Sequence, residues 1–249
     1  MHRFYLPPAD WNADALVLSG SEAHHCKNVL RMKIGDKAVL FDGRGRVIIG
    51  EISAVRAREV HLRKSLESTT PPPGCQITLA SAIPKGKKMD FIIEKAVEIG
   101  VSEIAPLVTN RTIVRLTAQE AAQKQTKWQA VAIEAAKQCG QNWLPQVHGP
   151  QTLEQFFAAA PRYDLRLVCS LQSDAVHLKT VLAGWADDKK GRRPATVLTL
   201  IGPEGDFTPA ELDLARIHDC KPMTLGPIVL KVETATVYSL SILSYELLD

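Results

Sequence analysis

The stretch that decides the fold is VLTLIGPEGDFTPAE, residues 197–211. Residues 197–201 are apolar apart from Thr199, which is typical of a strand buried on both faces of a parallel sheet. A loop rich in glycine, residues 202–205, follows this strand. Thr208 with Glu211 then forms the pattern of a capping box, which predicts the start of a helix. A strand, a glycine loop and a helix in this order predict one unit of an α/β domain.

The same alternation extends to both sides of this stretch. Apolar runs predict further strands at 77–83, 104–108, 165–169 and 223–225. Amphipathic patterns and capping residues predict helices at about 90–100, 117–140, 152 onward, 177–185 and up to 248. Such a series predicts a parallel sheet covered on both faces. Because ligands bind at the carboxyl ends of strands in these sheets, we expect a site at the loops 202–205 and 225–227.

The pattern before residue 71 is different. Short β-type runs at 15–18, 38–41, 47–52 and 59–62 predict a small barrel or sandwich. Ser19 with Glu22 predicts one capped helix. Its expected apolar side consists of Ala23, Cys26, Val29 and Leu30. Pro71-Pro72-Pro73-Gly74 predicts a stiff linker. We therefore expect a β-barrel domain over 1–70, a linker over 71–75 and an α/β domain over 76–249.

The composition is that of a globular chain with a slight cationic surplus. The 249 residues include 30 Lys and Arg against 27 Asp and Glu. Residues 1–70 hold 11 of the cations and 8 of the anions, so this segment carries the whole surplus, which is a weak indication of a polyanionic partner. The cysteines form no C-x-x-C pair, which favours reduced thiols. Neither a membrane-spanning apolar run nor the core of a signal peptide is present, so we expect a cytoplasmic protein without membrane contact.

Several common catalytic and nucleotide-binding motifs do not match. The glycines at 202 and 205 lack the G-x-G-x-x-G spacing, and no P-loop, G-x-S-x-G or H-E-x-x-H pattern occurs. His24-His25-Cys26 are consecutive, and adjacent helix residues point in different directions, so they do not chelate as an i, i+4 pair does. We expect no metal site.

The glycine loops carry a resemblance to a known family. LIGPEG at 200–205, followed by LGP at 225–227 and VLKVETA at 229–235, resembles the signature of the RsmE family. Matching segments elsewhere are VLRM at 29–32, KMDF at 88–91, EKAVEIGV at 94–101 and AAKQCGQN at 135–142. They occur in the family's order from the first domain to the last helix. RsmE enzymes are S-adenosylmethionine-dependent uridine methyltransferases of small-subunit ribosomal RNA and belong to the SPOUT superfamily.

The resemblance implies a fold and an assembly. It implies an amino-terminal β-barrel (PUA-like) domain that binds RNA, and an α/β domain whose carboxyl-terminal part forms a trefoil knot. It also implies a homodimer in which the last helix packs on a partner. The apolar side chains expected on that face are Val237, Leu240, Ile242, Leu243 and Leu247. Ordinary burial within one subunit is the alternative for the same face.

The resemblance also places the cofactor, S-adenosylmethionine, among three loops. These would be the loop after Val108, the loop 202–205 and the segment 225–233. The residues expected to bind the cofactor are Leu200, Ile201, Gly202, Glu204, Gly205, Leu225, Gly226, Leu230, Val232 and Glu233. The chain departs from the family pattern at Asp206, where glycine is usual, at Ile228 and Lys231, where arginine is usual, and at Val232, where threonine is usual.

Three residues are expected to take part in catalysis. Glu204 is a candidate contact to the cofactor or general base, although an acid after a strand can also stabilise the start of the next helix. Lys231 can stabilise charge that develops on a uracil oxygen or meet a phosphate. Asn142 can read a base edge, or it can simply cap a helix. For Glu233, in the first turn of the last helix, a structural role is favoured.

The expected substrate is small-subunit ribosomal RNA, methylated at the N3 ring nitrogen of a uridine. The residues expected to bind RNA are Arg3, Arg31, Lys33, Lys85, Lys87, Lys88, Arg111, Gln138 and Asn142. Because Ile228 and Lys231 depart from the family pattern, one alternative is a protein that binds RNA without catalysing methyl transfer. Methylation of the ribose 2′-hydroxyl is a second alternative.

Overall fold

The computed structural model describes residues 1–12, 15–112 and 116–248. These residues form two compact units. Unit 1 consists of Met1–Pro72 and Ile133–Leu144, and unit 2 of Pro73–Ala132 and Pro145–Asp249. The sequence-based division assigns 133–144 to the second domain, whereas in the structure this segment packs with unit 1.

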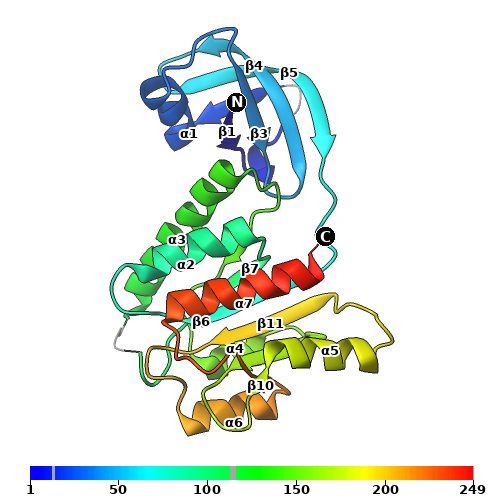
Figure 1. The fold of residues 1–249 in the computed structure, drawn as a ribbon. Helices are drawn as coiled ribbons and strands as arrows, with labels where there is room; N and C mark the ends of the chain where they lie inside the picture. The colour runs from blue at the N-terminus through cyan, green and yellow to red at the C-terminus, as the bar shows by residue number, and fades with distance from the viewer. Residues whose placement is uncertain (13–14, 113–115, 249) are drawn as a thin grey trace. The chain divides into compact units, whose positions relative to one another are not determined.

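Unit 1 is built on a curled five-stranded sheet (Figure 1). Its order is β1-β3-β4-β5-β2, and the pairing is antiparallel except between β1 and β3. The strands are β1 (His2–Tyr5), β2 (Leu16–Ser19), β3 (Lys37–Phe41), β4 (Arg46–Val55) and β5 (Glu59–Thr69). Alternate side chains, among them Phe4, Leu40, Ile48 and Val60, are fully buried on the concave side. The expected small β-domain is confirmed, but β1 was not predicted.

The helix of unit 1 differs from the prediction. α1 (Gly20–His24) continues into a π-helix at His25–Val29, and the amide of Leu30 donates to the carbonyl of His25, five residues earlier. The side chain of Ser19 makes no capping hydrogen bond, so the capping box predicted there is wrong. The wider turn also changes which side chains face the core. Val29, expected to be buried, is 60% exposed.

Unit 2 contains a seven-stranded parallel sheet of order β10-β12-β9-β11-β6-β7-β8. Its strands are β6 (Gln76–Ala82), β7 (Glu103–Leu107), β8 (Gln146–Val147), β9 (Leu165–Cys169), β10 (Val176–His177), β11 (Thr196–Ile201) and β12 (Lys221–Thr224). The short edge strands β8 and β10 were not predicted, since two residues carry no pattern.

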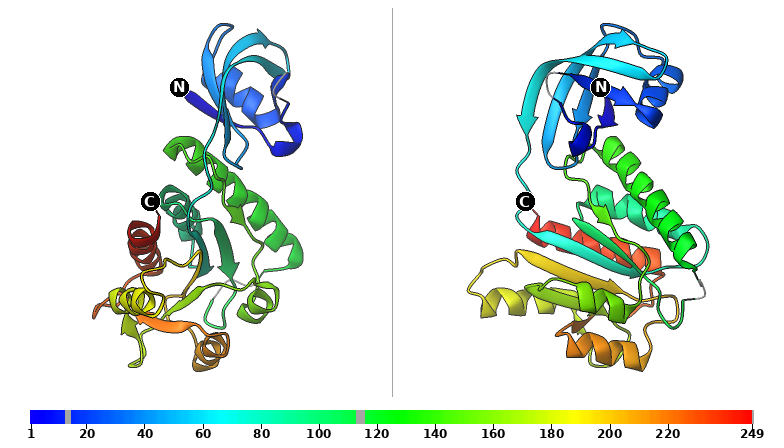
Figure 2. Two further views of the ribbon diagram at one scale, coloured as in Figure 1. Left: turned by 90° about the vertical axis from the view of Figure 1, so that its right-hand side faces the viewer. Right: turned by 180° about the vertical axis from the view of Figure 1, so that it is seen from behind.

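Helices cover both faces of this sheet, as Figure 2 shows. They are α2 (Lys88–Ile99), α3 (Ala118–Cys139), α4 (Leu153–Ala159), α5 (Leu178–Asp188), α6 (Pro209–Ile217) and α7 (Val232–Leu247). Complete capping boxes begin α4, at Thr152 with Gln155, and α6, at Thr208 with Glu211. Gly100 ends α2 with a φ of 98°, a conformation that favours glycine.

The side chains of β11 show how helices pack on both faces of the sheet in unit 2. Leu198 and Leu200 of β11 share a buried cluster with side chains of α4 and α6. The intervening Thr199 points to the other face, where its hydroxyl forms a 3.3 Å hydrogen bond with Ser239 of α7. The expected parallel sheet covered on both faces is confirmed. Because β12, β9 and β11 are neighbours in it, their carboxyl ends lie side by side.

None of the helices within the described ranges is long and apolar enough to cross a membrane. The trefoil knot that the resemblance implies stays a prediction.

Candidate functional site

A pocket of unit 2 lies where β9, β11 and β12 end. Each of these parallel strands contributes the loop at its carboxyl end, and the first turn of α7 contributes the remaining side chains. The lining residues are Cys169, Ser170, Leu171, Ile201, Gly202, Pro203, Glu204, Asp206, Thr224, Leu225, Gly226, Ile228, Val229, Leu230, Val232 and Ala235. This is the position at which open α/β sheets bind ligands.

Most of the residues expected to bind a cofactor line this pocket. They are Ile201, Gly202, Glu204, Leu225, Gly226, Leu230 and Val232. Leu200 is buried in β11, pointing into the core between the sheet and α6. Gly205 lies in the loop beside the lining residues, and Glu233 follows Val232 in the first turn of α7.

The loop after β11 is held by its own polar groups. Asp206 has a φ of 62°, and its carboxylate accepts a 2.8 Å hydrogen bond from the amide of Phe207. The guanidinium of Arg111 donates to the carbonyls of Gly205 and, at 3.3 Å, of Phe207. The loop after Val108 therefore contacts the glycine loop through Arg111, but its described residues do not line the pocket.

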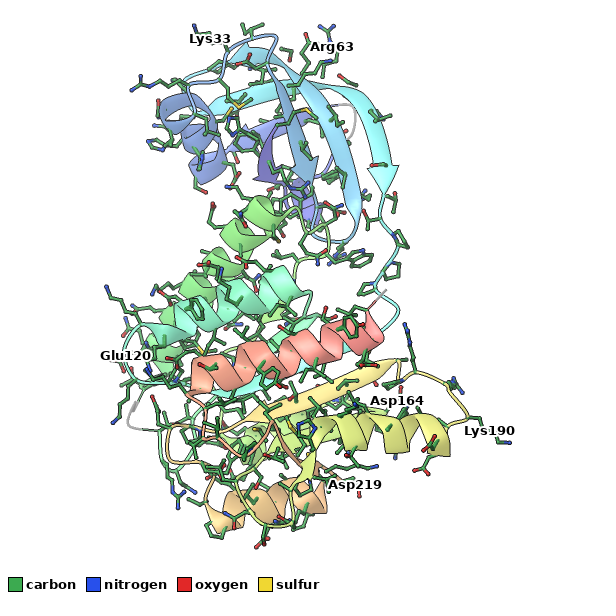
Figure 3. The ribbon with its side chains drawn as sticks, viewed as in Figure 1. Lys33, Arg63, Glu120, Asp164, Lys190 and Asp219 are labelled. Carbon is green, nitrogen blue, oxygen red and sulfur yellow. The ribbon has the colours of Figure 1, made fainter. Side chains whose placement is uncertain are left out.

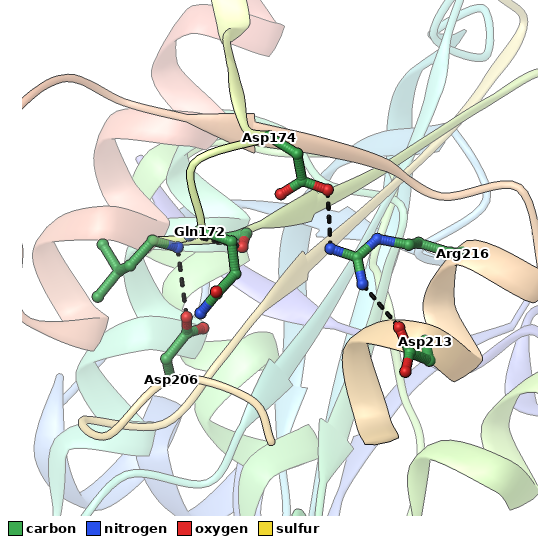
Figure 4. Close-up of polar contacts among 7 residues, drawn as sticks. Gln172, Asp174, Asp206, Asp213 and Arg216 are labelled. Atoms are coloured by element: carbon green, nitrogen blue, oxygen red, sulfur yellow. Dashed lines mark hydrogen bonds and ion pairs between the residues drawn. The ribbon is translucent and has the colours of Figure 1, made fainter. Parts of the chain in front are cut away.

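The loop after β9 forms the wall that sequence reasoning missed. The amide of Leu171 donates to the carboxylate of Asp206 at 3.3 Å (Figure 4). Arg216 of α6 holds the same loop through Asp174 at 2.8 Å and is itself held by Asp213. The segment 170–174 contains neither glycine nor proline, so no glycine-rich pattern marks it in the sequence.

The loop after β12 exposes its backbone to the pocket. The hydroxyl of Thr224 donates to the carbonyl of Gly226 at 3.1 Å and accepts from its amide at 3.3 Å. Ile228 and Val229 are 75% and 69% exposed although both are apolar. Apolar side chains at the mouth of a pocket provide a surface for the flat face of a ligand.

The space around Gly202 and Gly226 shows whether the pocket can hold a nucleoside-containing cofactor such as S-adenosylmethionine. A Cβ atom added at Gly226, where φ is 133°, would meet no atom within 4 Å, so the backbone there faces open space. A Cβ at Gly202 would lie 3.1 Å from the ring of Phe207. Gly202 is therefore needed for packing within the loop, rather than for space left to the ligand. Open backbone beside an apolar wall fits the adenosine part of such a cofactor.

The residues expected in catalysis fall into two groups. Glu204 lies in the pocket wall, and its carboxylate accepts from the amide of Lys85 at 3.3 Å. Lys231 is the exposed residue before α7, and its side chain has no hydrogen bond or ion pair within the described part of the chain. Asn142 belongs to unit 1. Its amide accepts from Arg3 at 2.6 Å and donates to the hydroxyl of Thr70 at 2.8 Å.

The residues expected to bind RNA are also divided between the units. In unit 1, Arg31, Lys33 and Gln138 are exposed, and Lys33 is labelled in Figure 3. Arg3 instead bonds to the segment 141–142 and lies over the ring of Phe41, and burial lowers its pKa.

In unit 2, Lys85 and Lys87 are exposed in the loop after β6. Arg111 is held by the glycine loop, as described above. Lys88 forms a 3.0 Å ion pair with Glu233. Partial burial opposes ionisation of Glu233, but hydrogen bonds from its own amide and from Lys88 outweigh this effect and lower its pKa.

No nucleophile stands out in the pocket. Burial raises the pKa of the Cys169 thiol to about 11, with a smaller contribution from Asp206, so this thiol is protonated at neutral pH. Among the residues that the structure describes, no group of three or more His, Cys, Asp or Glu side chains could hold a metal ion.

Comparison with known proteins agrees with this geometry. Residues 71–244 match the family described as RNA methyltransferase domain, and residues 18–65 match the RNA methyltransferase PUA domain. Ribosomal RNA small subunit methyltransferase E of Bacillus subtilis is 30% identical over 238 residues, which cover 94% of this chain and 91% of that protein.

Two solved structures with bound S-adenosylmethionine share the fold. The ribosomal RNA small subunit methyltransferase E of Neisseria gonorrhoeae superposes with a TM-score of 0.84 at 30% identity, and covers 98% of this chain and 96% of its own. A methyltransferase of Legionella pneumophila gives a TM-score of 0.86 at 32% identity, with the same coverage. The match over both units and the pocket at the three strand ends show that this chain belongs to the RNA methyltransferase family with an amino-terminal PUA domain.

Proposed function

We propose that the protein transfers a methyl group from S-adenosylmethionine to the N3 ring nitrogen of a uridine in small-subunit ribosomal RNA. The observation that carries this proposal is the pocket at the adjoining ends of β9, β11 and β12, formed by the loops that resemble the family signature. The bound cofactor supplies an electrophilic methyl group on a sulfonium. Since small ribosomal subunits are cytoplasmic, we place the reaction in the cytoplasm.

Positioning is expected to contribute most of the rate. Holding two reactants in the correct geometry can supply roughly 7–11 kcal/mol, whereas general-base assistance is typically worth about 10²–10⁴-fold. In this chain the Asp206–Leu171 hydrogen bond and the Arg216–Asp174 ion pair fix the wall of the pocket. Both act on the loop after β9, which they hold to the loop after β11 and to α6.

Glu204 and Lys231 are the residues that we propose for proton transfer and for charge stabilisation. Glu204 is exposed in the pocket wall, and Lys231 is an unpaired cation directly after the pocket residue Leu230, within the described part of the chain. Asn142 has both ends of its side-chain amide hydrogen-bonded inside unit 1. We assign it to holding the segment 140–144 against the sheet of unit 1.

We further propose that the protein acts as a homodimer through α7. Leu240, Leu243 and Leu247, expected on the partner face, are instead buried within their own unit. The side of α7 that remains open carries Tyr238 and Tyr245, which are 44% and 85% exposed. Aromatic side chains are enriched at protein interfaces, so this side is the proposed contact.

The test is methylation of small subunits purified from a strain that lacks the gene. We expect tritium from labelled S-adenosylmethionine to enter the ribosomal RNA, and nucleoside analysis to find it on N3 of uridine. Free ribosomal RNA serves as the second substrate, and preferential labelling of assembled subunits would identify these as the target. Label on a ribose hydroxyl, or cofactor binding without any transfer, would overturn the proposed reaction.

A further inference from the structure

Unit 1 carries a cleft that none of the expected RNA-binding residues lines. It has a volume of about 280 Å³ and lies between α1 with its π-helical continuation and the turn that joins β4 to β5. Ala23 and Val60, which are 4% and 0% exposed, form its apolar floor. The floor of the cleft therefore belongs to the buried core of unit 1.

The rim of this cleft is cationic. Lys27 comes from the π-helix, and Arg56 and Arg58 come from the turn; all three are exposed, as is His24. The turn is closed by a 2.8 Å hydrogen bond from the amide of Arg56 to the carbonyl of Glu59, which keeps both arginines at the rim.

These cations have no anionic partners of their own. Glu59 contributes the carboxylate of the lining, and it bonds to the ring of His61 at 3.1 Å. No ion pair joins Lys27, Arg56 or Arg58 to a carboxylate within the described ranges. Three cations therefore face one carboxylate in this lining, and an anion in the cleft would offset the repulsion among the cations.

The π-helix at His25–Val29 supports a functional role for the cleft. Helical spacing predicts Val29 on the core side, whereas in the π-helix it is 60% exposed, and Lys27 and Asn28 of the same turn line the cleft. Exposing an apolar side chain costs free energy, and single π turns are frequent at functional sites.

We infer that this cleft binds the phosphodiester backbone of the RNA substrate. The inference rests on the proposed function and adds to it a site remote in sequence from the cofactor loops. The lining offers three cations, the amide of Asn28 and the ring of His24 against the single carboxylate of Glu59, and it contains no Phe, Tyr or Trp. Contacts of this kind fix the position of a nucleic acid without reading its sequence.

The experiment compares two double variants of the full-length protein that lose the same charge. Lys27→Ala with Arg58→Ala removes two of the three rim cations, whereas Lys37→Ala with Arg63→Ala removes exposed cations of β3 and β5 outside the cleft; Arg63 is labelled in Figure 3. Affinity for small-subunit ribosomal RNA is measured by filter binding between about 50 and 300 mM salt, because binding through phosphate contacts weakens steeply over this range. Calorimetry with S-adenosylmethionine checks that each variant still binds the cofactor.

We expect the cleft variant to bind RNA roughly tenfold more weakly or worse, and its salt slope to flatten by about 1.4–1.8. The control pair should change both values much less. Lys27→Arg with Arg58→Lys, which keeps the charges, should restore binding. Equal losses in the two alanine pairs, or no loss in the cleft pair, would overturn the inference. A wild-type protein that binds RNA through the cleft but transfers no methyl group would refute the proposed function alone.

Discussion

Gly226 offers the sharpest test of how the pocket is built. Its φ of 133° lies in a region that other residues rarely adopt, and a Cβ atom there would meet nothing within 4 Å. Gly226→Ala therefore adds backbone strain without a steric clash. Holding a residue other than glycine in such a region costs of order 1–3 kcal/mol.

The loop can either keep its shape and bear this strain or relax, and the two cases differ in the quantity that changes. If the loop keeps its shape because Thr224 holds both the amide and the carbonyl of Gly226, the free energy of unfolding falls by the full amount. If the loop relaxes instead, unfolding changes little and the dissociation constant for S-adenosylmethionine rises by roughly 5- to 150-fold. The two losses together should amount to about 1–3 kcal/mol.

Urea unfolding and calorimetric titration of the same preparation measure both terms. Gly74→Ala is the matched control, because its φ is ordinary and no atom lies within 4 Å. It should be neutral or stabilise by about 0.4–1 kcal/mol. Gly202→Ala should lower the free energy of unfolding by about 1–3 kcal/mol, because the added methyl group would crowd the buried ring of Phe207. A Gly226→Ala protein with unchanged unfolding and unchanged affinity would refute this account of the loop.

Other substitutions separate further roles. Lys231→Ala should lower the single-turnover methylation rate by about 10²–10³-fold with cofactor affinity nearly kept, while Lys231→Arg changes little; a normal rate would remove this residue from the mechanism. Asp206→Gly removes the hydrogen bond to Leu171, so calorimetry should show roughly 2- to 12-fold weaker cofactor binding, and tighter binding would contradict this. Lys137→Ala leaves the largely buried carboxylate of Glu22 without its 3.0 Å partner, and urea unfolding should show a loss of about 3 kcal/mol that Glu22→Gln largely restores. Burial raises the pKa of Glu22 in the folded protein above 4.5, so the folded state binds this proton more tightly than the unfolded state. The free energy of unfolding should therefore fall as the pH rises from about 4.5 towards the folded pKa. A Glu22→Gln protein whose stability has the same pH dependence as the wild type would contradict this.

Short-range signals predicted the parts of the fold that depend on a few neighbouring residues. The capping boxes at Thr152 and Thr208 and the glycine after α2 act within one turn of helix, so sequence alone locates them. The strand that ends at Ile201 is equally local, because its apolar run reflects burial on both faces. The two glycine loops of the pocket followed directly from these elements.

The rest of the site depends on contacts that sequence spacing does not show. The wall at Leu171 exists because β9 lies between β12 and β11, an order that no local pattern specifies. The bond between Arg3 and Asn142 joins residues 139 positions apart, and it turns two expected RNA contacts into internal ones. The π-helix was missed because a pattern with helical spacing looks the same until one turn widens.

The division of α3 between the units has a consequence for synthesis on the ribosome. Unit 1 includes Ile133–Leu144, and the synthesis of this segment ends 72 residues after Pro72. At a synthesis rate of about 5–20 residues per second, roughly 4–14 s pass between the completion of Pro72 and the completion of this segment. During that time Glu22 lacks Lys137, and Arg3 lacks its hydrogen-bond partners in the segment 141–142. The amino-terminal part is therefore made first but finished late, and a chaperone that binds nascent chains would meet it incomplete.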